Sequence, residues 1–181
     1  MRTPRKLPPW ELLDEFFYVD PTSPSGLRWK KLLPKTTRNH VNGVAGHKEK
    51  NGYWRVPFSG IPGQKPIKYM VHRIIYCLLH KEDPGIFCID HKTDRSNNLD
   101  IRVATITQNH ANRQRPTRGN KTSKFKGVAY VASRRKWRAD ICKEYRSIFL
   151  GEFKTENEAA EAYNEAAREL FGEFAFLNEL D

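Results

Sequence analysis

A polar stretch near the middle of the chain, NRQRPTRGNKTS at residues 112–123, constrains the fold more than any other feature. It carries Pro116 and Gly119 and shows no apolar periodicity, so it can neither continue a helix nor place a strand in a core. The chain has 181 residues, enough for one ordinary domain or two small ones. The break therefore predicts two domains of unequal size, residues 1–113 and 123–181, joined by a linker at residues 114–122.

The charge of the chain is high and unevenly distributed. Its formal net charge is +11 and its isoelectric point is about 9.7, which suits a polyanionic partner. Residues 113–146 contain twelve lysines and arginines but two acids, whereas residues 152–181 contain nine acids and two basic residues. Such a one-sided distribution is typical of a surface that binds nucleic acid.

Composition argues against several classes of protein. The mean hydropathy is −0.74, and no apolar run approaches the roughly 20 residues of a membrane span. The basic start lacks the apolar stretch of a signal peptide, so we expect a cytoplasmic protein with no membrane partner. The three cysteines, Cys77, Cys88 and Cys142, are odd in number and lack C-x-x-C spacing, which argues against disulfides and a cysteine zinc site.

The first part of the chain alternates between helical and strand patterns. An amphipathic helix, ending with Phe16 and Phe17 on its apolar face, is predicted to begin after Pro9. Asn51-Gly52 is a hairpin turn signal ahead of predicted strands near 53–58 and 65–71, and Tyr53 is assigned to packing of that hairpin. Apolar residues at helical spacing predict a helix over 71–80.

An apolar run then ends in an acid and an imidazole, Asp90-His91, followed by an Asn-rich loop. Strands are predicted at 85–90 and 101–105, and a helix over 105–113 has Thr105 and Gln108 in capping-box register. This order of strand, loop, strand and helix places a residue of the 105–113 helix opposite the end of the 85–90 strand. Asp and Asn also collect in turns because they bond nearby backbone, so the Asp-His pair alone is weak evidence.

Residues 10–113 resemble HNH homing endonucleases of the phage and intron type, which have a ββα-metal active site. The resemblance rests on VHRIIYCLL, IDHKTDRSNN and IRVATITQNHAN, in that order and spacing. It implies a metal-dependent endonuclease that nicks DNA or cuts both strands in a bacterial or phage-infected cell. Mg²⁺, or alternatively Mn²⁺, prefers oxygen ligands, so the resemblance assigns Asp90 and Asn109 as metal ligands. His91, with an ordinary pKa near ~6.5, is assigned as the general base.

The family also has a central Asn that stabilises the loop presenting the histidine. The usual Asn-Leu-Arg before the second strand is here Asp100-Ile101-Arg102, one residue short of the pattern. We assign this role to Asn98, with Asn97 or Asp100 as alternatives.

Two neighbouring residues of the 71–80 helix also recur in the family pattern. His72 either supports the active site or packs under the helix. Arg73 is expected to hold a DNA phosphate, or an acid.

The second part has three strand patterns followed by one helix. The strands are predicted at 125–131, 136–142 and 147–153. The helix begins in a capping box formed by Thr155 and Glu158, has an alanine-rich face, and ends at Gly172.

Residues 122–178 resemble an AP2 (ERF-type) DNA-binding domain, through SKFKGVAYV, KWRADI, FLGEFKTENEAAEAYNEAARELFG and AFLN. The resemblance implies a three-stranded antiparallel sheet packed on one helix, with the other face of the sheet in the DNA major groove. Alternation along the strands places one set of side chains against the helix: Val128, Tyr130, Trp137, Ala139, Ile141 and Leu150. The expected DNA-binding residues of the whole chain are Arg73, Lys126, Arg134, Arg135, Lys136, Arg138, Lys143, Arg146 and Phe149.

The sequence thus predicts an α+β protein: a ββα-metal HNH domain followed by an AP2-like sheet and helix. The function that follows is a DNA endonuclease, with homing as the role the resemblance implies, acting on double-stranded DNA. The alternative is a non-catalytic AP2-type regulator whose HNH part is a degenerate scaffold. RNA is disfavoured because A-form major grooves are too narrow for a sheet to read. We expect a monomer, since nothing in the sequence indicates a dimer.

Overall fold

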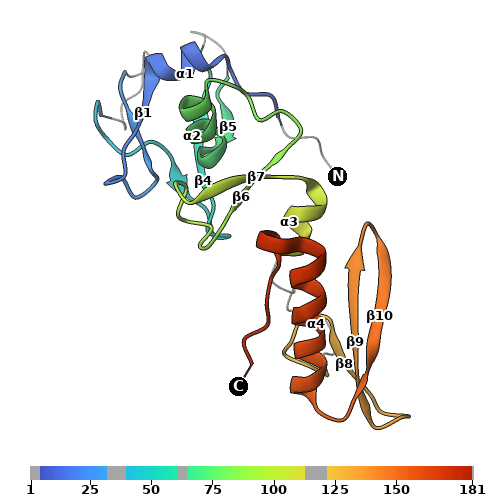
Figure 1. Ribbon diagram of the computed structural model, residues 1–181. Helices are drawn as coiled ribbons and strands as arrows, with labels where there is room; N and C mark the ends of the chain where they lie inside the picture. Colours follow the sequence, from blue (N-terminus) through green and yellow to red (C-terminus); the bar gives the residue numbers. More distant parts are fainter. Residues whose placement is uncertain (1–4, 32–39, 61–64, 113–121, 181) are drawn as a thin grey trace. The chain divides into compact units, whose positions relative to one another are not determined.

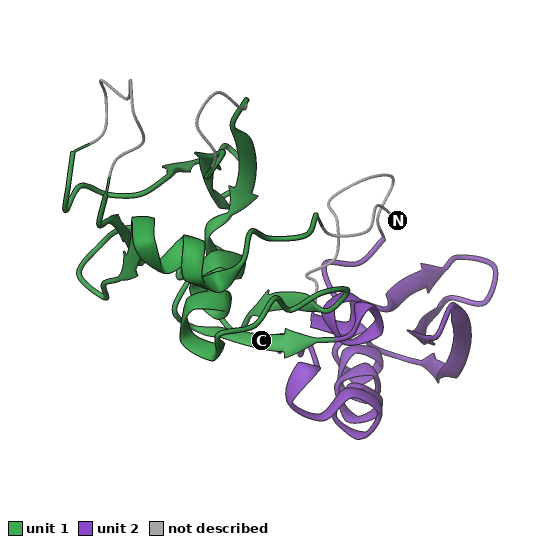
Figure 2. Cartoon of the chain, turned by 90° about the horizontal axis from the view of Figure 1, so that it is seen from above, with its two compact units in different colours: residues 1–104 green, residues 105–181 purple. Residues whose placement is uncertain are grey.

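The computed structural model describes residues 5–31, 40–60, 65–112 and 122–180 as an α+β protein with small antiparallel sheets (Figure 1). The chain divides into two compact units, residues 1–104 and 105–181 (Figure 2). The predicted nuclease domain ran to residue 113, whereas the helix α3, Ile106–Asn112, groups with the second unit. The predicted linker lies outside the described residues apart from Thr122.

The first unit contains two hairpins, a three-stranded sheet and two helices. β1 pairs with β2, β3–β4–β5 form the sheet, and β6 pairs with β7, all antiparallel. The elements are α1 (Trp10–Phe16), β1 (Phe17–Val19), β2 (Leu27–Trp29), β3 (His47–Lys48), β4 (Trp54–Phe58), β5 (Ile67–Met70), α2 (Val71–His80), β6 (Cys88–His91) and β7 (Ile101–Ala104).

Helix α2 lies at the centre of this unit, and the predicted bounds 71–80 are confirmed. Ile74 and Ile75 are fully buried in one core with Phe17 and Phe58, whose rings are 5.0 Å apart. Every residue from 71 to 77 is buried, including two polar ones. Burial of polar groups is costly unless they are hydrogen-bonded, so the contacts of these two residues are of interest.

Phe17 was predicted to lie in the first helix, and that prediction is wrong. The helix ends at Phe16, and Phe17 is extended, with φ −131° and ψ 157°. It begins β1 and pairs with Trp29 across the β1–β2 hairpin. An apolar residue such as Phe17 fits either a helical or a strand pattern. The turn at residues 20–26 favours the strand because it brings Trp29 alongside Phe17 as a pairing partner.

The second unit is a three-stranded antiparallel sheet, in the order β10–β9–β8, that contacts helix α4. Its elements are α3, β8 (Val128–Val131), β9 (Lys136–Lys143), β10 (Arg146–Phe153), α4 (Glu156–Phe171) and the short 3₁₀ helix η1 (Gly172–Phe174). The capping box of α4 is confirmed, since Thr155 and Glu158 bond each other's backbone N–H groups. The alanine-rich face is buried at Ala159, Ala160 and Ala167.

The close approach of helix and sheet explains why β8 begins later than predicted. Gly127 has φ +76°, and a Cβ there would lie 2.1 Å from the ring of Tyr163 on α4. A residue with a side chain could not occupy this turn without moving the helix. Residues 125–127 therefore form the turn into the strand rather than its first half.

The predicted helix-facing set of the sheet is largely confirmed. Val128, Ala139 and Ile141 are buried, and Trp137 and Leu150 pack against the same cores. Tyr130 is the exception, being 38% exposed with its ring 5.0 Å from that of Trp137. It lies near the end of the shortest of the three strands.

Candidate active site

His91, at the end of β6, is buried and bonded to a side chain from the loop that follows. Its Nε2 lies 3.2 Å from Oδ1 of Asn98, and Nδ2 of Asn98 donates to the backbone carbonyl of Ser25 at 2.9 Å. Because that carbonyl accepts only, the amide orientation of Asn98 is determined, and its oxygen faces the imidazole. Nε2 must then carry the hydrogen, which leaves the lone pair of neutral His91 on Nδ1.

The loop between β6 and β7 separates the three candidates for the central Asn role. Asn98 is 2% exposed and reaches His91. Asn97 instead accepts from the backbone N–H of Leu99, and Asp100 accepts from the hydroxyl of Thr93 at 2.8 Å. The structure therefore brings Asn98 to the histidine, as the sequence predicted, while its catalytic role stays a prediction.

A second buried imidazole lies against the first. His72 on α2 is 5% exposed, and its ring meets that of His91 edge-on with centroids 4.7 Å apart. Its Nδ1 has no hydrogen-bond partner within the described residues. Burial, and then the charge of a protonated His91, lower the pKa of His72 to about 3, so it is neutral at physiological pH. The two expectations for His72, support of the active site and packing under the helix, are compatible, because the ring is buried and contacts His91.

Burial also sets the protonation state of His91. It lowers the pKa of the imidazole below the usual value for histidine, while the hydrogen bond to Asn98 and the charge of Asp90 act in the opposite direction. The net direction is downward, so the ring is neutral at physiological pH. A neutral imidazole with a defined tautomer can accept a proton from water.

Asp90 is on the neighbouring position of β6 and pairs across the hairpin with Arg102 of β7. Oδ2 of Asp90 is 3.3 Å from Nη2 of Arg102, and the two side chains are 10% and 12% exposed. Successive strand residues point to opposite faces, so Asp90 and His91 project to different sides of the hairpin. The separation of a metal ligand from a base stays a prediction.

The donor set suits a hard cation. Within the described residues there is no group of three His, Cys, Asp or Glu able to hold a metal. The predicted ligands are one carboxylate, Asp90, and one amide, Asn109, an oxygen-only set that fits Mg²⁺ or Mn²⁺ held together with water and phosphate. Asn109 lies on α3 in the second unit, so its partnership with Asp90 stays a prediction.

Two residues beside the histidines were not recognised from the sequence as part of a site. The ring of Tyr53 is 5.7 Å from that of His91 and 5.9 Å from that of His72. The guanidinium carbon of Arg95 lies 5.8 Å from the centre of the Tyr53 ring. Tyr53 was assigned to hairpin packing, and no role was predicted for Arg95. Neither spacing nor a motif indicates that the turn before β4 and the loop between β6 and β7 lie close together.

Arg73 contacts protein groups where DNA was expected. Its side chain is 9% exposed, and it donates to the carbonyls of Phe87 and Gly85 and to the carboxylate of Asp83. Of the two expectations, the acid is the partner found. Arg73 thereby ties α2 to the segment that leads into β6, and its contact with DNA stays a prediction.

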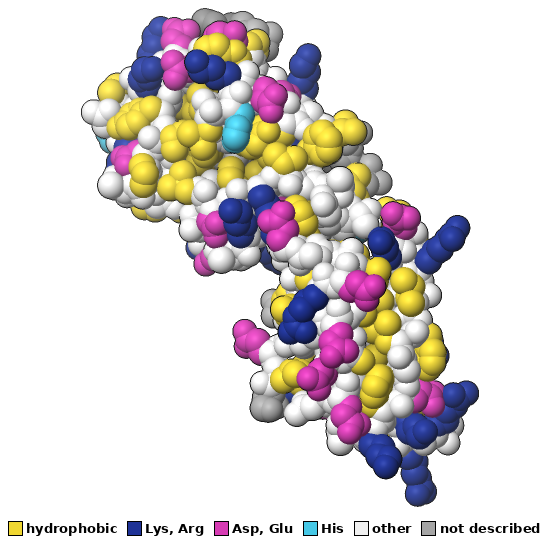
Figure 3. Space-filling view, in the orientation of Figure 1, with side chains coloured by type: hydrophobic (Ala, Val, Ile, Leu, Met, Phe, Trp, Pro, Cys, Tyr) yellow, Lys and Arg dark blue, Asp and Glu magenta, His cyan; other side chains and the backbone are white. Residues whose placement is uncertain are grey.

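The other expected DNA-binding residues lie on the second unit. Figure 3 shows lysine and arginine side chains around the end that carries the β8–β9 turn, and acidic side chains along α4. Arg138 bonds both carboxylate oxygens of Asp140 at 2.7 Å and lies 5.0 Å from the ring of Phe149. The exposed members of the set are Arg134, Arg135, Lys136, Arg138, Arg146 and Phe149, and Lys143 is half-buried.

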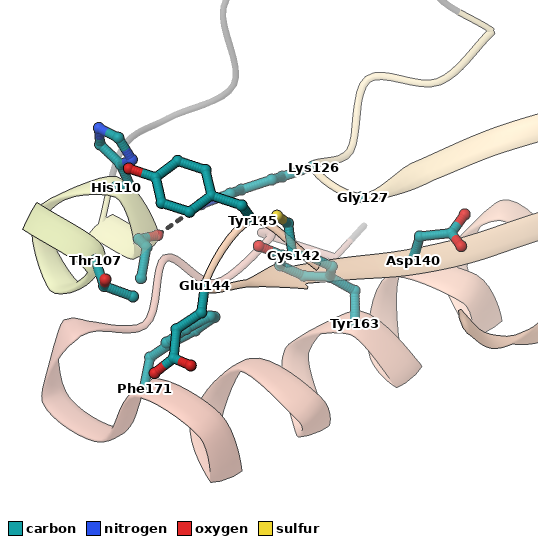
Figure 4. A pocket seen from close by; sticks show the side chains of 11 residues that line it. Thr107, His110, Lys126, Gly127, Asp140, Cys142, Glu144, Tyr145, Tyr163 and Phe171 are labelled. Atoms are coloured by element: carbon teal, nitrogen blue, oxygen red, sulfur yellow. Dashed lines mark hydrogen bonds between the residues drawn. The ribbon is translucent and has the colours of Figure 1, made fainter. Parts of the chain in front are cut away.

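Lys126 departs from that set. Its Nζ donates to the backbone carbonyl of Ala111 at 2.6 Å and lies 5.2 Å from the ring of Phe176. Burial lowers the pKa of this amine to about 8. Figure 4 shows Lys126 reaching toward the end of α3 across a cavity of about 270 Å³ within the second unit. The amine is thus desolvated and bonded to a carbonyl inside the unit, and its contact with a DNA phosphate stays a prediction.

Comparison with known proteins gives one informative match. The chain is 35% identical over 133 residues to an uncharacterized HNH endonuclease of Acanthamoeba polyphaga mimivirus. The aligned region covers 71% of this chain and 67% of that protein. No protein-family model and no solved structure matches the chain.

Proposed function

This chain belongs to the HNH endonuclease family, and on that premise we propose that it is a divalent-metal-dependent DNA endonuclease in which His91 is the general base. The observation that carries the proposal is the chain of hydrogen bonds from Ser25 through Asn98 to His91. It presents a neutral imidazole whose Nδ1 is the basic nitrogen, at the end of a rigid hairpin. A general base needs this combination of orientation and protonation state.

In the proposed reaction, Nδ1 of His91 removes a proton from a water molecule, and the resulting hydroxide attacks phosphorus. The bond to the 3′-oxygen breaks, and that oxygen leaves as a 3′-hydroxyl after taking up a proton. A cation held by Asp90 and Asn109 would neutralise charge on the phosphate and on the leaving oxygen. Asn98 keeps the proton on Nε2 and so prevents the ring from presenting the wrong nitrogen.

The second unit is proposed to hold double-stranded DNA through the exposed cations of its sheet. Arg135, Lys136 and Arg146 are exposed and lie on the sheet strands or the β8–β9 turn. The AP2-like reading of this unit is supported by a sheet with a helix on one face and cations clear of that helix. Such contacts position a protein on DNA, while base contacts specify the sequence.

Homing, and action as a monomer in the cytoplasm of a bacterial or virus-infected cell, belong to the proposal. Action in an infected cell is supported by the viral source of the similar protein. Homing rests on the resemblance of residues 10–113. Within the described part of the chain, no helix combines the length and apolar character needed to cross a bilayer.

A non-catalytic DNA-binding regulator is the second candidate, and one contact favours it. The carboxylate of Asp90 is paired with Arg102, which occupies part of the charge that a metal ligand would offer. In this reading the HNH hairpin is a scaffold whose chemistry has been lost.

Plasmid nicking separates the two candidates. Supercoiled DNA is incubated with the protein in Mg²⁺, in Mn²⁺ and in EDTA, and relaxed and linear products are measured. We expect metal-dependent nicking that falls about 10³-fold in His91→Ala, because general-base catalysis typically contributes 10²–10⁴-fold. The exposed His47→Ala serves as the control. Equal nicking by wild type and His91→Ala, or DNA binding without any nicking, would overturn the proposal.

A further inference from the structure

The charge pattern around His91 points to one residue that the proposed reaction does not yet use. Arg95 is exposed, and it has no carboxylate partner within the described residues. Other arginines of the first unit do have such partners. These are Arg28 with Asp20, Arg55 with Glu49, Arg73 with Asp83, and Arg102 with Asp90.

Arg95 is nevertheless held in place, by an aromatic ring. Its guanidinium lies over the ring of Tyr53. The backbone of the neighbouring Gly52 is also close, since a Cβ added to Gly52 would lie 3.8 Å from Cβ of Arg95. The turn that carries Tyr53 is itself ordered, because Oδ1 of Asn51 accepts the backbone N–H of Tyr53. A guanidinium over an aromatic face keeps its N–H edge open to an anion, and less rotational freedom is lost when that anion binds.

The ring beneath Arg95 is part of the histidine cluster. Tyr53 contacts both His91 and His72, so the guanidinium is one aromatic ring away from the general base. Asp94 places negative charge near His91 and acts on it electrostatically, as Arg95 does with opposite sign. A phosphate that approaches His91 is repelled by this carboxylate. Arg102 is paired with Asp90, whereas Arg95 is exposed and acts on His91, so it is suited to offset that repulsion.

We propose that Arg95, held on the ring of Tyr53, binds the non-bridging oxygens of the phosphodiester that the His91-activated water attacks. The planar fork of the guanidinium donates to two phosphate oxygens and stabilises the charge that develops on them. Arg95 is therefore a catalytic residue and Tyr53 a positioning residue. This inference rests on the proposed endonuclease function.

Cleavage kinetics provide the first test. Arg95→Ala should lower kcat/KM for plasmid nicking about 10²-fold, as loss of one transition-state donor does. Arg95→Lys keeps the charge without the fork and should recover part of the loss. Tyr53→Phe should retain activity and Tyr53→Leu should lose it, because the ring rather than the hydroxyl holds the guanidinium. Lys68→Ala, which removes an exposed cation from β5, is the control.

DNA binding provides a second test that does not depend on cleavage. In an inactive His91→Ala background, affinity for a short duplex is measured against salt concentration. Loss of one phosphate contact lowers the slope of log K against log salt by about 0.9, so Arg95→Ala should show this change and Arg95→Lys should not. If wild type never nicks DNA but the slope still falls, the endonuclease proposal fails and the phosphate contact stands. If Arg95→Ala matches Lys68→Ala in slope, the phosphate contact is overturned, whatever the nicking rate.

Discussion

The two units of this protein use polar side chains in opposite ways. The first unit buries them: His72, Arg73, Asp90, His91 and Asn98 are all buried. The second unit keeps most of its cations in water, on the turn and strands of a small sheet. Buried groups have defined partners, orientations and altered pKa values, which chemistry requires. Exposed cations retain their charge and freedom, which is sufficient for holding a polyanion.

The largest expected effect on DNA binding comes from neutralising the exposed cations of the sheet, which separates these two roles. The triple variant Arg135→Gln, Lys136→Gln, Arg146→Gln should weaken DNA binding about 100-fold at physiological salt, and the salt slope should fall by about 2.7. At saturating DNA, kcat for nicking should stay near wild type. Fluorescence anisotropy and nicking rates measure the two quantities.

A single neutralisation on the acidic face of the second unit is the control for that triple variant. Arg168→Gln on α4 should leave the salt slope unchanged. An unchanged affinity in the triple variant would mean that the second unit does not hold DNA by this surface.

A smaller effect, on stability, tests the buried hydrogen bonds of the first unit. Asn98→Ala leaves the carbonyl of Ser25 and the N–H of His91 without their partner, so unfolding free energy should fall by about 1–3 kcal/mol. Asn98→Asp keeps the acceptor toward His91, but it buries a charge and turns an oxygen toward the Ser25 carbonyl, so its loss of stability should be at least as large. It should nevertheless retain more nicking activity than Asn98→Ala. Urea unfolding and nicking rates report both, and equal activities would remove Asn98 from the orientation of the base.

Burial of His72 should also make the stability of the first unit depend on pH. Folded His72 has a pKa of about 3, whereas the unfolded residue titrates near ~6.5, so below that pH the unfolded chain binds the extra proton. Stability is therefore fully present above about pH 6.5 and is lost as the pH falls, at up to about 1.4 kcal/mol per pH unit.

Substitution isolates the contribution of His72. His72→Phe should reduce the pH slope between pH 6 and 4 in urea unfolding, and the exposed His47→Phe should not. Parallel pH profiles for wild type and His72→Phe would show that His72 is protonated in the folded protein.

Local patterns predicted much of this fold. The helix over 71–80, the capping boxes at Thr105 and Thr155, and the Asn51-Gly52 hairpin depend on neighbouring residues and occur where the sequence placed them. Motif order also placed the histidine at a strand end and left three candidates for the central Asn, of which Asn98 is the one that contacts His91.

The orientation of long cationic side chains could not be predicted in the same way. Arg73 and Lys126 were both expected on DNA, and both lie against carbonyl groups of distant residues. The long, flexible side chains of Arg and Lys can reach any hydrogen-bond acceptor that the tertiary structure brings near. A sequence pattern does not identify that acceptor.

The sequence by itself determined the α+β composition, the positions of the principal helices and the Asp90-His91 pair, because periodicity, caps and turn residues act over a few positions. Only the tertiary structure decided that Ser25 orients Asn98, that His72 lies against His91, and that Tyr53 and Arg95 meet beside them. These contacts join residues up to 73 positions apart, and they depend on the packing of α2 and the hairpins into one core. Long-range packing turns a short motif into a site with a defined tautomer and charge.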